Sequence, residues 1–557
     1  MSGINAKEFI DELVFCLKEE DLVKAKALLQ FASDSNITAD VQRKAMIELA
    51  KGPESVVFPL LEYLTKIEIS DPKVQESLYE LILDKAYNNT DLVIKYITEN
   101  EKKARLLFLK AAGELQLAEA GHTLTRIITN DKDPDILVAA ITALGQLKLT
   151  ESLSCLADMA DRPDPEVKRA AIFAIAENGG NDAVDHLTGF IGEDDYTNKF
   201  TVEALADIQD MYSLEKLTSL LSSSQTNVRD TAIDQLMRIG TKATPVLTKA
   251  FQNAEADYLV HLVTTLGYIG DPAAVNPILE IINTQPEDAN IRQAAYEAME
   301  RIPSPKTAIS LVQGLQDPVE SVRMSAARAI DKNLSKVLVA GLRNVVREGS
   351  DDAENAVGAL IDSDASNIFN FLAEEESFLE LAEPHILEKA DPDTRKTFLK
   401  HMESIGHKEF SHTMVSKVSD QDEPEEKSAQ IYVVDDSKMM LKLYQNKLKA
   451  RGIQPVVFHK PEDAIPQIIK NKPDLVITDL NMPNISGLEM TKELRKKYTR
   501  QDLPILMITT QSDFVEKDDA DIKINDTVLT KSGINKILHK PFKDEDFYAA
   551  VGNFVEL

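Results

Sequence analysis

The chain has 557 residues, of which 43% are hydrophobic and 28% are charged. That length exceeds what one hydrophobic core supports, so the sequence predicts several domains or a repeat architecture. No run of 18 or more apolar residues occurs, so we expect no membrane insertion. The amino-terminal stretch lacks the features of a signal peptide, which favours a cytoplasmic location. The two cysteines, Cys16 and Cys155, form no disulfide framework or metal cluster, and we expect two buried thiols.

The formal net charge of −30 is not spread evenly along the chain. Residues 430–557 contain 19 basic and 19 acidic residues, so residues 1–429 carry the entire excess of acid. A polyanion of this kind repels nucleic acid and anionic lipid. We therefore expect no nucleic-acid partner and expect proteins with basic or mixed surfaces instead. A contribution to solubility alone also accounts for the charge.

Five segments between residues 133 and 331 share a pattern in which a β-branched residue is followed four positions later by alanine. The β-branched positions are separated by 31, 61, 63 and 31 residues, which corresponds to one or two copies of a unit near 31 residues. The pairs are Ile136 and Ala140, Val167 and Ala171, Val228 and Ala232, Ile291 and Ala295, and Val322 and Ala326. A further copy fits at Leu259, with Val263 in place of the alanine. A small side chain at a fixed position allows a neighbouring helix to approach closely.

The pattern within each unit predicts two helices separated by a turn, such as the one at Gly270-Asp271-Pro272. Asp-Pro dipeptides favour helix starts, because the aspartate caps free backbone amides and proline fits the first turn. They recur at Asp71-Pro72, Asp133-Pro134, Asp164-Pro165 and Asp391-Pro392. A single helix pair cannot bury its apolar face, whereas stacked pairs bury a continuous core. The pattern therefore predicts an all-α solenoid.

The period, the Asp-Pro starts and the recurring alanine resemble HEAT-like repeats of the short bacterial type. The resemblance is strongest over about 131–348 and weaker over 1–130 and 349–418, where terminal repeats act as caps. We assign residues 1–418 to a HEAT-like α-solenoid domain. The resemblance implies a scaffold for protein–protein interaction. Some members of the family are bilin lyases, but no sequence feature marks a chromophore site here.

Residues 419–429 interrupt the apolar periodicity and are short, acidic and proline-containing, which is typical of an extended linker. Residues 430–557 then alternate apolar strand-like runs with amphipathic helices, expected near 461–471, 488–498 and 543–554. This alternation predicts an α/β domain with a doubly wound parallel sheet of the flavodoxin-like kind. In such sheets the functional site forms beyond the carboxyl ends of the strands.

Polar residues stand at those predicted strand ends, namely Asp435, Asp436, Asp479, Thr509 and Lys540. Three carboxylates in one pocket repel one another, and a bound divalent cation relieves the repulsion. Oxygen ligands with retained water suit Mg²⁺. A lysine and a hydroxyl complement a phosphoryl group, so the set favours phosphoryl transfer onto a carboxylate.

The stretches VVDDS, DLVITDLNMPNISG, LPILMITT and KPF, in this order, resemble the receiver domains of two-component response regulators. The resemblance covers about 128 residues and implies a role for each matching position. Asp479 would accept the phosphoryl group, and Asp435, Asp436, Asp479 and the backbone carbonyl of Asn481 would hold Mg²⁺. Lys540 would pair with the phosphoryl oxygens, and Thr509 would donate a hydroxyl bond to them. A histidine kinase or a histidine phosphotransfer protein would be the phosphodonor.

One departure from the receiver pattern concerns spacing. Thr509 and Lys540 are 31 positions apart, whereas receivers usually have a separation in the low twenties. The additional residues lie near 513–533. They modify the output of the receiver, for example by docking on the solenoid, or they form a tolerated surface loop.

These observations favour a bacterial response regulator that is phosphorylated on Asp479 and uses the solenoid as an output or targeting module. It would not be an enzyme, beyond at most weak autophosphatase activity. One alternative is a receiver-controlled lyase-type enzyme, which bilin binding by the purified protein would reveal. Another is a phosphate sink or a receiver that self-associates on phosphorylation, which a change in oligomeric mass would reveal.

Overall fold

The computed structural model describes residues 6–32, 37–67, 69–99, 101–390, 392–418, 429–480, 482, 485–509, 533–540, 542–555 and 557. It divides into two compact units, Met1–Lys216 and Leu217–Leu557. Among the described residues, no helix combines the length and apolar character needed to cross a bilayer.

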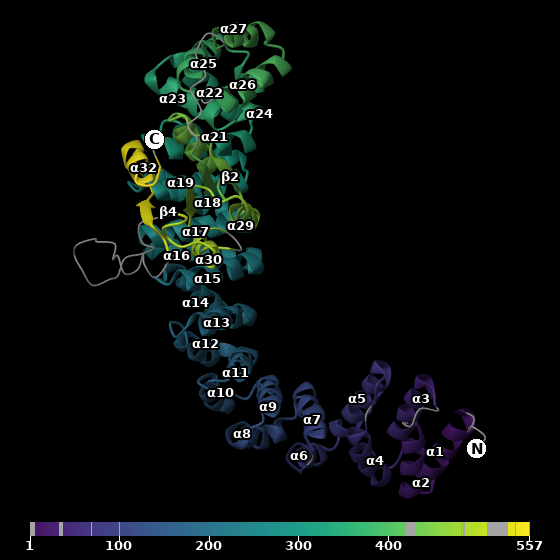
Figure 1. The fold of residues 1–557 in the computed structure, drawn as a ribbon. Coiled ribbons are helices and arrows are strands. Elements are labelled where there is room, and N and C mark those ends of the chain that lie inside the picture. The colour runs from purple at the N-terminus through teal and green to yellow at the C-terminus, as the bar shows by residue number, and fades with distance from the viewer. Residues whose placement is uncertain are drawn as a thin grey trace. The chain divides into compact units, whose positions relative to one another are not determined.

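Helices make up the regular structure that is described in the first unit (Figure 1). They are α1 (Ala6–Lys18), α2 (Leu22–Phe31), α3 (Ala39–Ala50), α4 (Glu54–Lys66), α5 (Pro72–Tyr87), α6 (Thr90–Glu99), α7 (Lys102–Glu114), α8 (Gly121–Asn130), α9 (Pro134–Gln146), α10 (Leu153–Ala160), α11 (Pro165–Asn178), α12 (Gly180–Gly189) and α13 (Asp195–Ile208), followed by α14 (Met211–Ser219), which contains the boundary. Alternate helices of this unit, such as α7, α9 and α11, pack side by side and form one layer of the array.

The second unit contains a helical array of its own, followed along the chain by a mixed α/β domain. Its array helices are α15 (Thr226–Ile239), α16 (Thr244–Ala250), α17 (Ala256–Ile269), α18 (Val275–Asn283), α19 (Ala289–Arg301), α20 (Ala308–Gly314), α21 (Glu320–Lys332), α22 (Lys336–Glu348), α23 (Asp351–Asp362), α24 (Ser366–Leu372), α25 (Glu376–Glu388), α26 (Pro392–Ser404) and α27 (Lys408–Val418). The α/β domain contains β1 (Ile431–Val434), α28 (Lys438–Lys449), β2 (Val456–Phe458), α29 (Pro461–Lys470), β3 (Leu475–Asp479), α30 (Gly487–Arg495), β4 (Ile505–Thr509), β5 (Lys536–His539) and α32 (Asp544–Val551).

Asp-Pro dipeptides start helices as the sequence predicts. The carboxylate of Asp133 accepts hydrogen bonds from the backbone amides of Asp135 and Ile136, at 3.0 and 3.4 Å. Asp71 and Asp164 cap α5 and α11 in the same way. Each cap satisfies amides that have no partner within the helix. The predicted start at Asp391 lies outside the described residues.

The repeated small residues lie where neighbouring helices meet. All five alanines of the pattern and Val263 are fully buried, and so are the β-branched partners, whereas Leu259 is half-buried. Glycines also allow close helix approach. A Cβ atom on Gly145 in α9 would lie 2.7 Å from the Cα of Ala174 in α11, which is too close. A Cβ on Gly267 would lie 2.9 Å from the Cα of Ala298 in α19. Close helix approach therefore depends on these positions in both units.

The α/β domain contains a five-stranded parallel sheet in the order β2-β1-β3-β4-β5. Residues such as Val433 and Ile477 point to one face and pack with residues of α28 and α32. Their strand neighbours Val434 and Val476 point to the other face and pack with α29 and α30. Both faces are thus buried, which explains why the strands read as continuous apolar runs. The predicted fold class, an all-α solenoid followed by a doubly wound α/β domain, is confirmed.

Three helices of the α/β domain lie close to their predicted places, and α30 and α32 are shorter than predicted. Two other predictions concern residues that the structure does not describe. Residues 419–428 of the proposed linker at 419–429 lie outside the described residues. So do residues 510–532, which include most of the additional segment after Thr509.

Candidate phosphoacceptor site

The parallel sheet brings four polar strand ends to one edge. Asp479 and Thr509 are the last residues of the neighbouring strands β3 and β4. Asp435 and Asp436 directly follow β1, and Lys540 directly follows β5. Because parallel strands point the same way, their carboxyl ends meet at one edge of the sheet. Asp435, Asp436, Asp479 and Lys540 line one pocket, and Thr509 contacts Lys540 through its backbone carbonyl. Asn481 lies outside the described residues.

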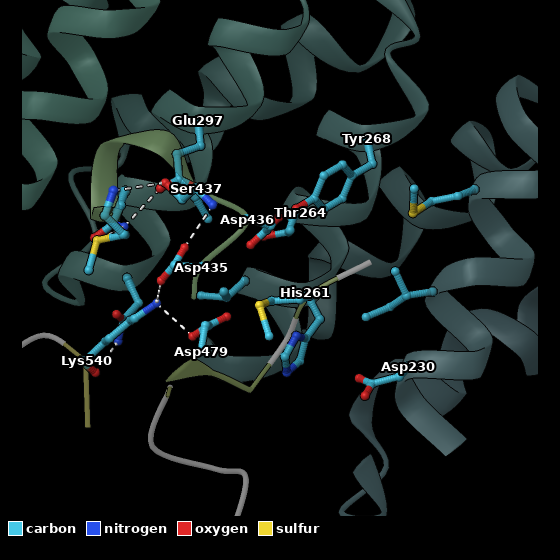
Figure 2. A pocket seen from close by; sticks show the side chains of 18 of the residues that line it. Asp230, His261, Thr264, Tyr268, Glu297, Asp435, Asp436, Ser437, Asp479 and Lys540 are labelled. Atoms are coloured by element: carbon cyan, nitrogen blue, oxygen red, sulfur yellow. Dashed lines mark hydrogen bonds and ion pairs between the residues drawn. The ribbon is translucent and has the colours of Figure 1, made fainter. Parts of the chain in front are cut away.

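Lys540 connects two of the carboxylates (Figure 2). Its Nζ atom lies 2.8 Å from Oδ1 of Asp479 and 3.4 Å from Oδ2 of Asp435. Only 12% of the lysine side chain is exposed. Burial alone would lower the pKa of the ammonium group, but Asp435 and Asp479 outweigh it and raise the pKa well above its usual value. Lys540 is thus a permanent positive charge beside Asp479.

The acidic pair after β1 sits in an unfavourable environment for charge. Asp435 is 1% exposed, and burial together with nearby Asp479 raises its pKa to about 7, although Lys540 opposes the change. Burial and Asp479 likewise raise the pKa of Asp436 to about 7. Carboxylates that are costly to ionise in a protein interior gain strongly from a cation placed between them.

Local backbone geometry holds these groups in place. The backbone amide of Ser437 donates to Oδ1 of Asp435 at 2.8 Å. The backbone amide of Lys540 donates to the carbonyl of Thr509 at 2.7 Å, and the Thr509 side chain is buried. Gly487 begins α30 directly against the end of β3, where a Cβ atom would lie 2.1 Å from the carbonyl oxygen of Asp479. That glycine is required by close backbone approach.

The donor set fits a magnesium ion. Asp435, Asp436 and Asp479 offer carboxylate oxygens on one side of the pocket, and Mg²⁺ uses one or two carboxylates while keeping several waters. Within the described part of the chain, no three acidic, histidine or cysteine side chains enclose a metal position by themselves.

Residues of the helical array complete the walls of the site, and the sequence had not indicated them. The hydroxyl of Tyr268 in α17 donates to Oδ2 of Asp436 (Figure 2). Nδ2 of Asn290 in α19 donates to the carbonyl of Lys540 at 2.9 Å. The pocket has about 940 Å³ of empty space, part of it open to solvent. These partners are separated by 168 and 250 positions along the chain, so no local pattern could have pointed to them.

Comparison with protein families agrees with both halves of this architecture. Residues 431–552 match the model of the response regulator receiver domain. HEAT repeats match at 90–176, 122–198, 191–262 and 259–331. The chain thus joins a helical repeat array to a parallel α/β regulatory domain. Residues 431–552 are thus a response regulator receiver domain, and HEAT repeats occur over 90–331.

The family match begins earlier than the sequence pattern suggested. We expected the clearest repeats over about 131–348, but the matches begin at residue 90 and end at 331. Helices α6 and α7 pack against each other, and α7 packs against α9, although no Asp-Pro dipeptide introduces α6 or α7. Helix pairing therefore continues where the local start signal is absent.

Solved structures similar to this chain include several receiver proteins. The chemotaxis protein CheY4 of Vibrio cholerae is 24% identical over 23% of this chain and 100% of its own, with a TM-score of 0.20. A protein of Chloroflexus aurantiacus described as a response regulator is 30% identical over 23% of this chain and 98% of its own, with a TM-score of 0.20. A two-component response regulator from Clostridium difficile is 25% identical over 23% of this chain and 95% of its own, with a TM-score of 0.19.

Proposed function

We propose that this protein is a response regulator of a two-component phosphorelay, phosphorylated on Asp479, with the HEAT-repeat solenoid as its output or targeting module. The observation that carries the proposal is the contact between Lys540 and Asp479 at 2.8 Å, beside the buried carboxylate of Asp435. A nucleophilic carboxylate with a fixed cation next to it, and two further carboxylates able to hold a metal, is the arrangement that phosphoryl transfer to aspartate needs.

The site residues divide the chemistry between them. An oxygen of the Asp479 carboxylate attacks phosphorus, and the bond from phosphorus to the imidazole nitrogen of a histidine kinase or phosphotransfer protein breaks. Asp435, Asp436 and Asp479, with the backbone carbonyl of Asn481 as the resemblance to receivers implies, would hold Mg²⁺, which would supply charge neutralisation. Lys540 pairs with a phosphoryl oxygen, and the hydroxyl of Thr509 donates to another. We expect no enzymatic turnover beyond slow hydrolysis of the acyl phosphate.

The domain organisation follows the same proposal. We assign residues 1–418 to the solenoid, 419–429 to a linker and 430–557 to the receiver. A kinase-driven relay places the protein in the cytoplasm. The solenoid, which carries the acidic excess of the chain, binds a protein partner rather than nucleic acid. Phosphorylation adds about two negative charges, enough to shift a two-state domain.

The test is phosphorylation by a small donor. Incubation of the full-length protein with Mg²⁺ and acetyl phosphate should give one phosphoryl adduct per chain, visible by intact-mass spectrometry and removed by mild base. Asp479→Asn should abolish the adduct, and chelation of the metal should prevent it. An adduct of equal yield in Asp479→Asn would refute the assignment of the acceptor.

A further inference from the structure

The receiver rests on a defined face of the solenoid within the second unit. Met324 of α21 is buried in the same apolar cluster as Leu443 and Tyr444 of α28. Nζ of Lys447 in α28 lies 3.2 Å from Oε2 of Glu320 in α21. Helices α17, α19 and α21 together form this face, which we call the docking face. It meets the receiver at the edge of the sheet that holds the phosphoacceptor.

Two contacts across the docking face involve the site itself. Tyr268 donates its hydroxyl to Asp436, a predicted magnesium ligand, and Asn290 donates to the backbone carbonyl of Lys540. Asp479 is 8% exposed in this arrangement. A phosphodonor protein must bring its phosphoryl group into line with the Asp479 oxygen. The solenoid covers part of the approach to that atom.

The solenoid side of the pocket is acidic. Asp230 and Asp234 of α15 and Glu297 of α19 line it (Figure 2 labels Asp230 and Glu297). Burial, with a smaller contribution from Glu489, raises the pKa of Asp234. Lys540 is the single lysine or arginine among the described lining residues. A phosphoryl group on Asp479 would therefore enter a pocket in which solenoid carboxylates face it.

A nearby histidine adds no positive charge, whereas a nearby arginine pairs with one of these acids. Burial, followed by the effect of Arg229, lowers the pKa of His261 to about 3, so this lining residue is neutral near pH 7. Nη1 of Arg301 lies 4.0 Å from Oε2 of Glu297, and its guanidinium lies over the ring of Tyr268, 4.4 Å from the ring centroid. Like charges in a partly desolvated pocket repel strongly, because the effective dielectric constant is low.

We propose that the docking face formed by α17, α19 and α21 binds the phosphoacceptor edge of the receiver, and that docking and phosphorylation of Asp479 exclude each other. The inference deepens the proposed function and rests on it. A phosphoryl group adds about two negative charges opposite the solenoid acids, and its acceptor oxygens compete with Asp436 for the Tyr268 hydroxyl. By linkage, docking slows phosphorylation, and phosphorylation releases the docking face for a protein partner.

The first test compares two tyrosines of the same helix. Tyr268→Phe removes the hydroxyl bond to Asp436 and should raise the initial rate of phosphorylation by acetyl phosphate by about tenfold, because a hydrogen bond to a charged group contributes that much to the closed state. Tyr258→Phe is the matched control, since the Tyr258 hydroxyl bonds the carbonyl of Thr218 within the array at 3.2 Å. Its rate should equal that of the wild type.

A second variant acts away from the site. Glu320→Lys reverses the charge that faces Lys447 across the docking face and touches no predicted ligand. It should also raise the phosphorylation rate several-fold. If Glu320→Lys and Tyr268→Phe both raise the phosphorylation rate, the cause is loss of docking. A local effect of the missing hydroxyl on Asp436 would raise the rate in Tyr268→Phe alone.

Release of the face is measured by thiol labelling of the full chain. Nε2 of Gln293 contacts Sδ of Met440 across the face at 3.5 Å, so the thiol introduced by Gln293→Cys should react slowly in the unphosphorylated protein. Phosphorylation should accelerate the reaction at least fivefold. A thiol introduced by Gln313→Cys, at an exposed position of α20, should react at the same rate in the phosphorylated and the unphosphorylated protein.

The outcomes distinguish the two proposals. If no variant and no wild-type sample acquires a phosphoryl group on Asp479, both the proposed function and the docking inference fall. If Asp479 is phosphorylated at one rate in the wild type, Tyr268→Phe and Glu320→Lys, and labelling at position 293 does not change, the function stands and the docking inference is wrong.

Discussion

The carboxyl group of Asp436 is costly to ionise in its buried position. Burial and the neighbouring Asp479 raise its pKa to about 7, far above that of an aspartate in an unfolded chain, near 4. The folded protein therefore holds more protons than the unfolded chain between these values. The stability that the protonated form contributes is complete below pH 4 and is lost as the pH rises through 7. Function at neutral pH thus favours a bound cation.

Replacing Asp436 with asparagine should remove that dependence. Without Mg²⁺ the variant and the wild type should be similar near pH 4, and the variant should be more stable at pH 8 by roughly 2 kcal/mol, since an amide carries no charge to bury. Added Mg²⁺ should stabilise the wild type at pH 8 and have little effect on Asp436→Asn. Urea unfolding followed by circular dichroism at several pH values measures both effects. Parallel pH profiles for the two proteins would contradict this account.

Helix packing in the array depends on positions without side chains. Gly145 of α9 faces the backbone of Ala174 in α11, with 2.7 Å between an added Cβ and Cα and 2.9 Å to the carbonyl oxygen. Backbone atoms cannot turn aside as a flexible side chain can, so a larger residue must push the helices apart. Gly189 in α12 is the opposite case, because nothing lies within 4 Å of an added Cβ.

The two glycines should therefore respond to alanine with opposite signs. Gly145→Ala should destabilise the protein by about 1–2 kcal/mol, because overpacking exceeds the gain in helix propensity. Gly189→Ala should stabilise it by about 0.5 kcal/mol, since only the propensity gain remains. Calorimetric unfolding temperatures of the two variants check the prediction, and a shift in the same direction for both would count against it.

At the level of elements, most of the fold could be predicted from the sequence. The interval near 31 residues and the alanine four positions after each β-branched residue predicted the helix pairs, because close packing leaves a periodic mark on composition. The strand ends predicted the site, because parallel strands bring Asp435, Asp479 and Lys540 to one edge. Half-buried Leu259 shows that this register holds less well at one repeat.

At the level of the whole molecule, the sequence could not predict which solenoid residues meet the receiver. Tyr268 and Asn290 are ordinary helix residues with no local signal of function, and their partners lie 168 and 250 positions away. Such contacts depend on how two folded surfaces fit together. The charge distribution gave a partial indication, since a strongly acidic array beside a neutral receiver makes added negative charge between them costly.

Partner binding is the whole-molecule consequence of the docking proposal. Phosphorylated protein should retain a protein partner that the unphosphorylated form does not, and Glu320→Lys should retain it without phosphorylation, because the docking face is then exposed. Affinity capture with matched samples, followed by binding measurements on the purified partner, checks this. Equal binding by the phosphorylated and unphosphorylated forms would contradict a gated docking face.

The most direct test of the central claim locates the phosphoryl group chemically. Borohydride converts a phosphorylated aspartate into homoserine, which peptide mass spectrometry assigns to a position. After treatment with acetyl phosphate and Mg²⁺, we predict homoserine at position 479 and at no other aspartate. Homoserine at Asp435, Asp436 or elsewhere, with Asp479 unchanged, would contradict the assignment of Asp479 as the acceptor.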